Sequence, residues 1–309
     1  MAGFYAKWRY LQGMNRCSCR LVDTWGDFLD FWVEARLKDA DAQIGLWQTR
    51  YMDKYPELLT KQVKSYEEAN VKWQTIAKRV FSRMPSRIRL MRKARDNVRE
   101  VYMQVFAKAS ESLMLDFSVV FVIYVGIGCG AGWATTYQAQ PAVLVGLENV
   151  ADEKWHRKST LEGMISHELG HLAHMAWRKE WASFEKAEQD PLFQLYSEGF
   201  AQKCEHLILG KDSWHMTQEK DWLYWCERNR SWLAKEFLRR LEKHLPVNDF
   251  FGSWFNIKEK KQTGYYLGLT FIRMLETTCS LKEIATFNTA NVRNLGIEYL
   301  RSASNEISA

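Results

Sequence analysis

His167-Glu168-Leu169-Gly170-His171 decides the fold around it, because this stretch has the pattern His-Glu-x-x-His. Two histidines four residues apart lie on one face of an α-helix, so two imidazole nitrogens can bind one zinc ion. The glutamate between them can then act as a base on the attacking water. The stretch therefore predicts a helix that carries part of a zinc site, and metal-assisted hydrolysis as its chemistry.

The neighbouring sequence predicts that this helix is long enough to be stable. Ser159-Thr160-Leu161-Glu162 matches a capping box at its start. Apolar residues follow at helical spacing, namely Leu161, Met164, Ile165, Leu169, Leu172, Ala173 and Ala176. The two histidines fall outside this stripe, so we expect them to face a cavity. The alternative is a pair of ordinary histidines on a polar helix face.

A second helix supplies a third candidate ligand. Asp190-Pro191 is typical of a helix start, and Gly210 is a natural stop. The helix expected over Leu192 to Leu209 carries Glu198, 27 residues beyond His171, which leaves room for the chain to turn between the helices. Two histidines and one glutamate would bind one Zn²⁺ per chain and leave the fourth position to water, as catalysis requires.

The two motifs together, His167 to His171 and Ser197-Glu198-Gly199-Phe200-Ala201, resemble those of the gluzincin class of zinc metallopeptidases. In that class a glutamate on a downstream helix completes the zinc site. The resemblance implies Glu198 as the third ligand and Glu168 as the general base. It also implies a zincin-like fold.

Two narrower likenesses accompany this one. The Glu-Gly-Phe-Ala run is similar to the glutamate motif of the one-zinc aminopeptidases, which usually have Asn where this chain has Ser197 and a shorter separation between the motifs. Gly146-Leu147-Glu148-Asn149 resembles their motif for a substrate's free amine, and the alternative is a strand end followed by a polar turn. The better overall likeness, over roughly residues 25 to 290, is to predicted bacterial and organellar zinc-dependent proteases.

Further residues are candidates for supporting roles. A helix that begins at Thr263-Gly264 carries Tyr265 and Tyr266, either of which could donate a hydrogen bond to a tetrahedral oxyanion, and the alternative is two core tyrosines. The spacing does not choose between them. His174 could replace Glu198 as a ligand. His206 and His215 could bind substrate or donate to the transition state, and Gln202 or Glu205 could orient a zinc-bound imidazole.

The rest of the chain predicts an α+β fold that is mainly helical. Helices are expected near residues 23–53, with a break around Gly45, and near 56–82 and 86–112, and strands over 117–127, 133–138 and 142–147. The strands would form a small mixed sheet over the His-Glu-x-x-His helix. We expect a helical N-terminal region, residues 1–112, and a catalytic domain with a helical C-terminal part, residues 113–309.

Composition favours a cytoplasmic protein, and a peptide or protein substrate is what the resemblance to zinc metallopeptidases implies. Among 309 residues, 43 are basic and 37 acidic, a mild excess that does not favour nucleic-acid binding. Six cysteines in so long a chain indicate reduced thiols, and no stretch is long and apolar enough to cross a bilayer. The Arg-rich segment 83–99 is interpreted as a solvated helix face, with a regulatory partner as the alternative.

The sequence therefore predicts a zinc metallopeptidase. His167, His171 and Glu198 would bind the metal, Glu168 would serve as the base, and a tyrosine or histidine would stabilise the oxyanion. The rival hypothesis is a non-catalytic, zinc-stabilised interaction protein that binds a protein or anionic partner through its Arg-rich N-terminal half.

Overall fold

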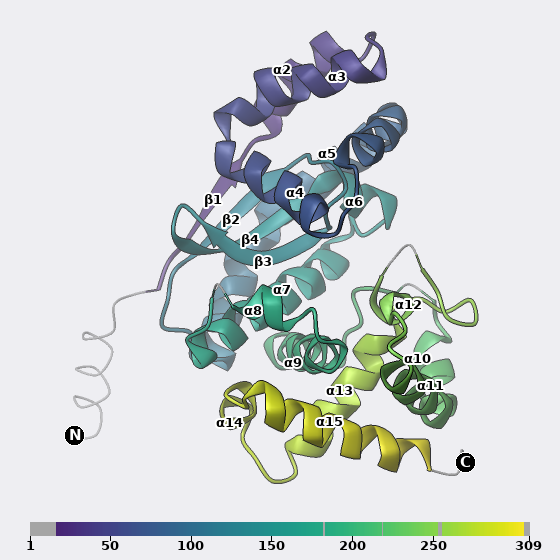
Figure 1. Ribbon diagram of the computed structural model, residues 1–309. Coiled ribbons are helices and arrows are strands. Elements are labelled where there is room, and N and C mark those ends of the chain that lie inside the picture. Colours follow the sequence, from purple (N-terminus) through teal and green to yellow (C-terminus); the bar gives the residue numbers. More distant parts are fainter. Residues whose placement is uncertain (1–16, 182, 218, 253–254, 306–309) are drawn as a thin grey trace, which may run out of the picture.

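The structure is a computed structural model that describes residues 17–181, 183–217, 219–252 and 255–305. Most of these residues are helical, and four strands form one mixed sheet (Figure 1). The predicted α+β class is therefore confirmed. One cluster of buried apolar side chains extends from the first helix described to the last.

The sheet has the strand order β1-β2-β4-β3. Its strands are β1 (Cys19–Asp23), β2 (Val119–Tyr124), β3 (Gly132–Tyr137) and β4 (Gln140–Gly146). β2 lies parallel to both β1 and β4, whereas β3 is antiparallel to β4. All six residues of β2 are buried, as the β-branched run predicted. The strand expected over 117–127 is shorter than predicted, because the chain leaves the sheet after Tyr124.

The strand β1 corrects the prediction for the N-terminal part, which placed no strand before residue 117. Cys19 pairs with Val119 and Asp23 with Ile123. Each pair is 100 residues apart in the sequence, so no local pattern of residues signals it. This pairing also joins residues from both sides of the expected boundary at 112/113 in one sheet, and the division into two domains stays a prediction.

The helices before β2 differ from the prediction in their ends. The observed elements are α2 (Trp25–Ala35), α3 (Ala40–Leu46), the π-helical turn η1 (Trp47–Tyr51), the 3₁₀ turn η2 (Met52–Lys54), α4 (Pro56–Glu68) and α5 (Trp73–Ser112). The helix expected over 23–53 is divided between α2 and α3, before Ala40, and not around Gly45, which lies within α3. The helices expected over 56–82 and 86–112 have other limits.

The helix α5 continues through Pro85, where a break was predicted. A proline inside a helix costs about 3 kcal/mol, because it removes a hydrogen bond and crowds the preceding turn. Pro85 is exposed, whereas Phe81 and Met84 beside it are buried in the core. The apolar packing of α5 on both sides of Pro85 therefore outweighs the local cost.

The elements after the sheet carry both motifs. They are α6 (Leu147–Asp152), α7 (Lys158–Arg178), α8 (Phe184–Ala187), α9 (Pro191–Leu209), α10 (Trp222–Arg228), α11 (Arg230–Glu242), α12 (Asn248–Phe251), α13 (Thr263–Leu275), α14 (Leu281–Ala285) and α15 (Thr289–Ser304). The predicted start of α9 is confirmed, because the Asp190 side chain accepts hydrogen bonds from the Leu192 and Phe193 amides. The predicted capping box is wrong: α7 begins at Lys158, and its N-cap Arg157 makes no side-chain cap.

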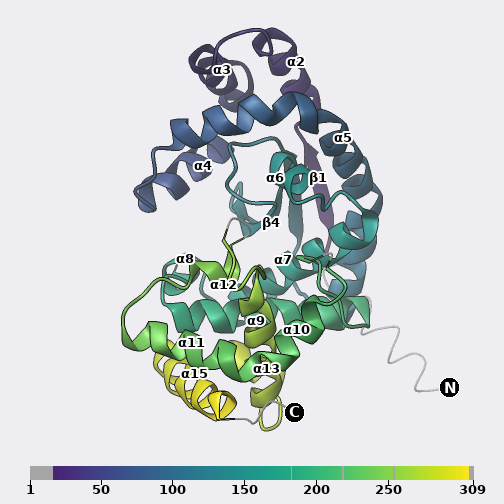
Figure 2. The same ribbon diagram turned by 90° about the vertical axis from the view of Figure 1, so that its right-hand side faces the viewer.

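Glycines set the close packing of the helices that carry the motifs. A methyl group on Gly170 of α7 would lie 2.7 Å from Cys204 Cβ of α9. One on Gly199 of α9 would lie 2.2 Å from the Gly268 backbone of α13. Contacts at such distances exclude any larger residue. The layers therefore follow one another from the sheet through α7 and α9 to α13 (Figures 1 and 2). Within the described part, no helix is long and apolar enough to cross a bilayer.

Candidate metal centre and its cleft

The three residues predicted as metal ligands lie together between α7 and α9. Glu198 Oε2 is 3.1 Å from His167 Nε2 and 3.5 Å from His171 Nε2. One ligand atom from each of the three residues lies within 4.8 Å of the other two. The turn between the helices thus brings Glu198 opposite both histidines.

These distances fit a tetrahedral zinc site. Two ligand atoms that are each about 2.0–2.1 Å from a tetrahedral zinc lie about 3.3 Å from one another. The two nitrogen–oxygen distances in the structure lie on either side of this value. Two nitrogens and one carboxylate oxygen are also the ligand types of a catalytic zinc site. The donor set therefore fits one Zn²⁺ with one position left for water or substrate.

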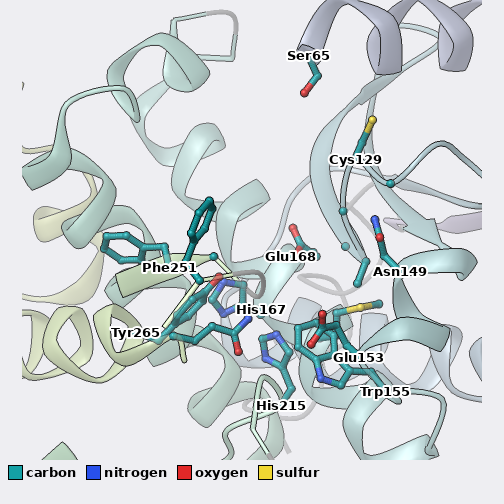
Figure 3. Close-up of a pocket in the computed structure, with 18 of the residues that line it drawn as sticks. Ser65, Cys129, Asn149, Glu153, Trp155, His167, Glu168, His215, Phe251 and Tyr265 are labelled. Carbon is teal, nitrogen blue, oxygen red and sulfur yellow. The ribbon is translucent and has the colours of Figure 1, made fainter. Parts of the chain in front are cut away.

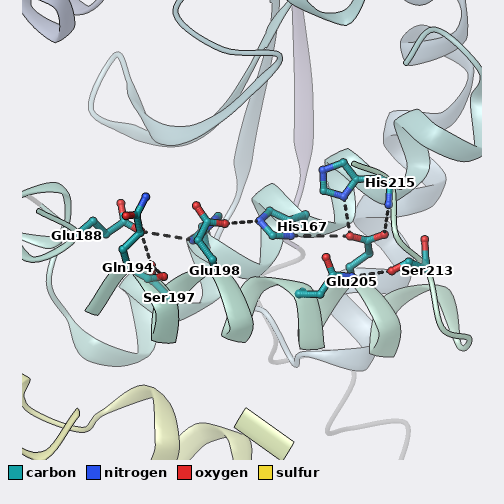
Figure 4. Close-up of polar contacts among 10 residues, drawn as sticks. His167, Glu188, Gln194, Ser197, Glu198, Glu205, Ser213 and His215 are labelled. Carbon is teal, nitrogen blue, oxygen red and sulfur yellow. Dashed lines mark hydrogen bonds and ion pairs between the residues drawn. The ribbon is translucent and has the colours of Figure 1, made fainter. Parts of the chain in front are cut away.

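A carboxylate lies behind each histidine. His167 Nδ1 is 3.8 Å from Glu205 Oε2, and His171 Nδ1 is 3.9 Å from Glu188 Oε1 (Figure 4). A carboxylate on this side favours a proton on Nδ1 and so presents Nε2 to a metal. Glu205 therefore has the position that the sequence suggested for an orienting residue. Gln202, the other candidate, donates instead to the Ser213 carbonyl.

Glu188 and Ser197 are functional candidates that the sequence reasoning missed. The Ser197 hydroxyl donates a 2.7 Å hydrogen bond to Glu188 Oε1, the same oxygen that faces His171. From the sequence alone, Ser197 stands out only as the residue that replaces the Asn of the one-zinc aminopeptidases, and it has no assigned role. No sequence signal marks Glu188, which belongs to the segment between α8 and α9.

Burial and the nearby carboxylates decide the charges of the site. Burial lowers the pKa of His167 to about 4, which keeps its imidazole neutral, as a metal ligand must be. Burial acts in the same direction on His171, but the hydrogen bond that it donates to Glu198 and the charges of Glu198, Glu188 and Glu168 outweigh it and raise its pKa to about 9. The carboxylates thus favour a positive charge at this point, as they would favour a metal cation.

Glu168 lines a pocket beside the ligand candidate His167 (Figure 3), and it also lines a second pocket together with all three ligand candidates. Burial raises its pKa, which suits a general base. A methyl group on Gly132 of β3 would lie 2.4 Å from Glu168 Oε1, so the glycine lets the carboxylate approach the strand. The residue predicted as the base is therefore held between α7 and the edge of the sheet.

The structure distinguishes the two tyrosines. The Tyr265 ring lies 5.4 Å from the His167 ring, centroid to centroid, and lines the cleft with Glu168. The Tyr266 ring packs 6.3 Å from Trp214 and lines none of the pockets that contain Glu168. Adjacent helical residues point about 100° apart, so only one of the pair faces the metal ligands. Tyr265 is brought to the site and Tyr266 is not.

The remaining histidines separate in the same way. His215 lines the cleft, and its Nδ1 lies 2.7 Å from Glu205 Oε2. His174 is buried among aromatic rings of α8 and α9, 4.2 Å from Phe200 between centroids, and lies outside the metal-ligand group. His206 lies 2.8 Å from the Ser213 carbonyl through Nε2, so it supports the segment that carries His215. His215 is therefore the one of these three that faces the cleft.

The Gly146 to Asn149 turn does not offer its carboxylate to the cleft. Glu148 is fully buried, and its two oxygens accept hydrogen bonds from the Gly126 and Gly128 amides. It therefore holds the glycine-rich loop that follows β2, residues 126–131. Asn149 is the residue of this turn that lines the cleft.

The cleft beside these residues has a volume of about 400 Å³. α4 and the glycine-rich loop line one side, and α7, Phe251 and Tyr265 line the other (Figure 3). β3 is an edge strand, because no strand in the described part of the chain pairs with its outer side. His167, Glu168 and Gly132 of the edge strand β3 thus line the cleft, and His171 and Glu198 line the adjoining pocket together with the same three residues.

No protein-family model, no curated protein and no solved structure matches the chain.

Proposed function

We propose that this chain is a zinc-dependent peptidase with a zincin-like fold. The observation that carries the proposal is that His167, His171 and Glu198, the candidate ligands, line one pocket together with the carboxylate of Glu168. When bound, zinc would polarise the substrate carbonyl and acidify the attacking water. The class agrees with the gluzincin motifs in the sequence.

The chain's own residues would move the proton and stabilise the oxyanion. Glu168 takes a proton from the attacking water and passes it to the leaving amine, which its position between α7 and β3 supports. Tyr265 donates a hydrogen bond to the oxyanion. His215, whose Nδ1 donates to Glu205, offers a second donor from Nε2 in its imidazolium form. Glu188 and Glu205 hold the two ligand imidazoles in place.

The free edge of β3 supports an extended peptide as the substrate. An extended chain can pair with an exposed strand edge through its backbone, which requires no particular sequence. Gly132 of β3 is next to the Glu168 carboxylate. A peptide paired with β3 would therefore have its backbone near the base and the metal ligands.

Digestion of a peptide library by the wild-type chain and by Glu168→Gln tests the proposal. We expect the wild type to contain about one zinc per chain and to cut peptides. Glu168→Gln should keep the zinc and lose about 10²–10⁴-fold in cleavage rate, because only the proton transfer is removed. Tyr265→Phe should lower kcat while Tyr266→Phe leaves it unchanged.

Glu185→Gln is the matched control, since Glu185 lines the same pocket as Glu168 but is exposed. It loses the same charge and should cut at the wild-type rate. Unchanged cleavage in Glu168→Gln would refute the mechanism. Bound zinc with no cleavage of any peptide by the wild type would favour the zinc-stabilised interaction protein instead.

A further inference from the structure

A basic pocket adjoins the cleft on the side away from α9. We call it the arginine pocket. It has a volume of about 210 Å³ and is lined by Arg79, Val80, Arg83 and Arg87 of α5 and by Asn149 and Asp152 at α6. Asn149 also lines the cleft that contains Glu168. The arginine pocket and the cleft therefore share Asn149 in their linings.

The arginine pocket has an excess of positive charge. Its three arginines are four residues apart, which places them on one face of α5. Arg87 is 5% exposed and forms an ion pair with Asp152, the only carboxylate among the lining residues. Arg79 and Arg83 are exposed at the opening. Asp152 is thus paired with Arg87, and the guanidinium group of Arg83 adds positive charge at the opening.

Burial makes this arrangement favourable for an anion. It lowers the pKa of Arg87, and the charge of Arg83 acts in the same direction, against the opposite effect of Asp152. The positive charges of Arg83 and Arg87 repel each other, and a bound anion relieves that repulsion. A guanidinium group also binds a carboxylate through two parallel hydrogen bonds. A carboxylate is therefore a fitting ligand.

The opposite side of the metal ligands is acidic. The pocket there has a volume of about 190 Å³ and is lined by Glu185, Glu188 and Glu198 as well as Glu168. A peptide in the cleft would thus meet negative charge on one side and the arginine pocket on the other. This polarity distinguishes the two directions in which a peptide can lie.

We propose that the arginine pocket binds a carboxylate carried by the peptide substrate at a fixed position from the bond that is cut. The inference deepens the proposed peptidase function and rests on it. The carboxylate can belong to an Asp or Glu side chain or to the C-terminus of the peptide. The other exposed basic residues of α5, including Arg89, Arg92 and Lys93, do not line the pocket, so one enclosed group fits better than a long polyanion.

Paired peptides test the inference. Each peptide that the wild type cuts is made again in two forms. In one form Asn replaces Asp and Gln replaces Glu, and in the other form the C-terminus is amidated. We expect one of these changes to lower kcat/KM by about 10-fold or more, because a desolvated charged hydrogen bond is lost. Arg83→Gln should abolish the preference. Arg92→Gln removes the same charge from an exposed position of α5 outside the pocket and should retain it.

A binding measurement keeps the test independent of catalysis. Fluorescence anisotropy of a labelled random peptide pool with one fixed Glu, against the same pool with Gln, measures the preference on the Glu168→Gln chain. A preference for Glu that Arg83→Gln removes supports the inference even if no peptide is cut, in which case only the proposed function fails.

Four results would overturn the inference. The wild type could bind and cut both members of every pair equally. The preference could survive in Arg83→Gln, or fall equally in Arg83→Gln and Arg92→Gln. Salt-dependent binding of a single-stranded RNA of about 20 nucleotides that both arginine variants weaken equally would assign the charges of α5 to a polyanion instead.

Discussion

At the scale of single residues, the site depends on carboxylates that do not touch the metal. Glu205 faces His167, and Glu188 faces His171 and accepts a hydrogen bond from Ser197. Each fixes which nitrogen of its histidine carries the proton. A ligand that is already oriented loses less freedom when the metal binds.

We predict that Glu205→Gln and Glu188→Gln each weaken zinc binding by about 10–100-fold, because each substitution removes the negative charge behind Nδ1 of a ligand imidazole. Competition with a zinc-binding dye measures the affinity. Glu185→Gln, which removes a carboxylate from the same pocket without touching a ligand, should bind zinc like the wild type. Equal affinities in all four proteins would show that these carboxylates do not orient the ligands.

The sequence pointed to the three ligand candidates and to Glu205 as a support, but not to Glu188. The helical spacing of His167 and His171 is a local property, so it can be read from five letters. Glu188 faces His171 only because the segment after α8 turns back toward α7, and nothing local encodes that turn. The choice of Tyr265 over Tyr266 likewise depends on the rotation of α13 against α9.

At the scale of elements, the metal centre depends on how closely α7, α9 and α13 pack. Gly170 lets α9 approach α7, and Gly199 and Gly268 let α13 approach α9. Glu198 is adjacent to Gly199, so the contact between Gly199 and Gly268 also sets the position of Glu198, the third candidate ligand, relative to α7. A small shift of α9 would move the carboxylate oxygen away from both imidazoles.

We predict that Gly199→Ala lowers the free energy of unfolding by about 1–3 kcal/mol, since the added methyl group overlaps the Gly268 backbone. It should also weaken zinc binding, because α9 must move. Gly45→Ala in α3 is the control: a methyl group there meets nothing within 4 Å, and alanine should stabilise the helix by about 0.5–1 kcal/mol. Urea unfolding measures both changes, and a Gly199→Ala chain as stable as the wild type would contradict the packing argument.

At the scale of the whole molecule, the metal would join two helices whose other faces lie in the core. α7 contacts the sheet and α5, whereas α9 contacts α13 and α15 (Figure 2). The ligands come from both helices. A metal bound between them would therefore stabilise the folded chain, because the unfolded chain has no preformed site that binds the metal equally well.

We predict that zinc raises the melting temperature. At a free zinc concentration about one hundred times Kd, binding adds about 2.7 kcal/mol to the free energy of unfolding. Removing the metal with a chelator should reverse the gain, and His171→Ala should abolish it. His244→Ala, which removes an exposed histidine, should keep the full response. Differential scanning calorimetry measures these changes, and a melting temperature independent of zinc would place the metal outside the core helices.

The sequence by itself determined the α+β class, the second motif helix with its aspartate cap and the three metal-ligating candidates. These follow from spacing within one element or from the chemistry of single side chains. Only the tertiary structure decided the pairing of β1 with β2, the passage of α5 through Pro85, the role of Glu148 in the glycine-rich loop and the arginine pocket beside the cleft. Each of these depends on contacts between segments far apart in the chain, where the free energy of packing outweighs local preference.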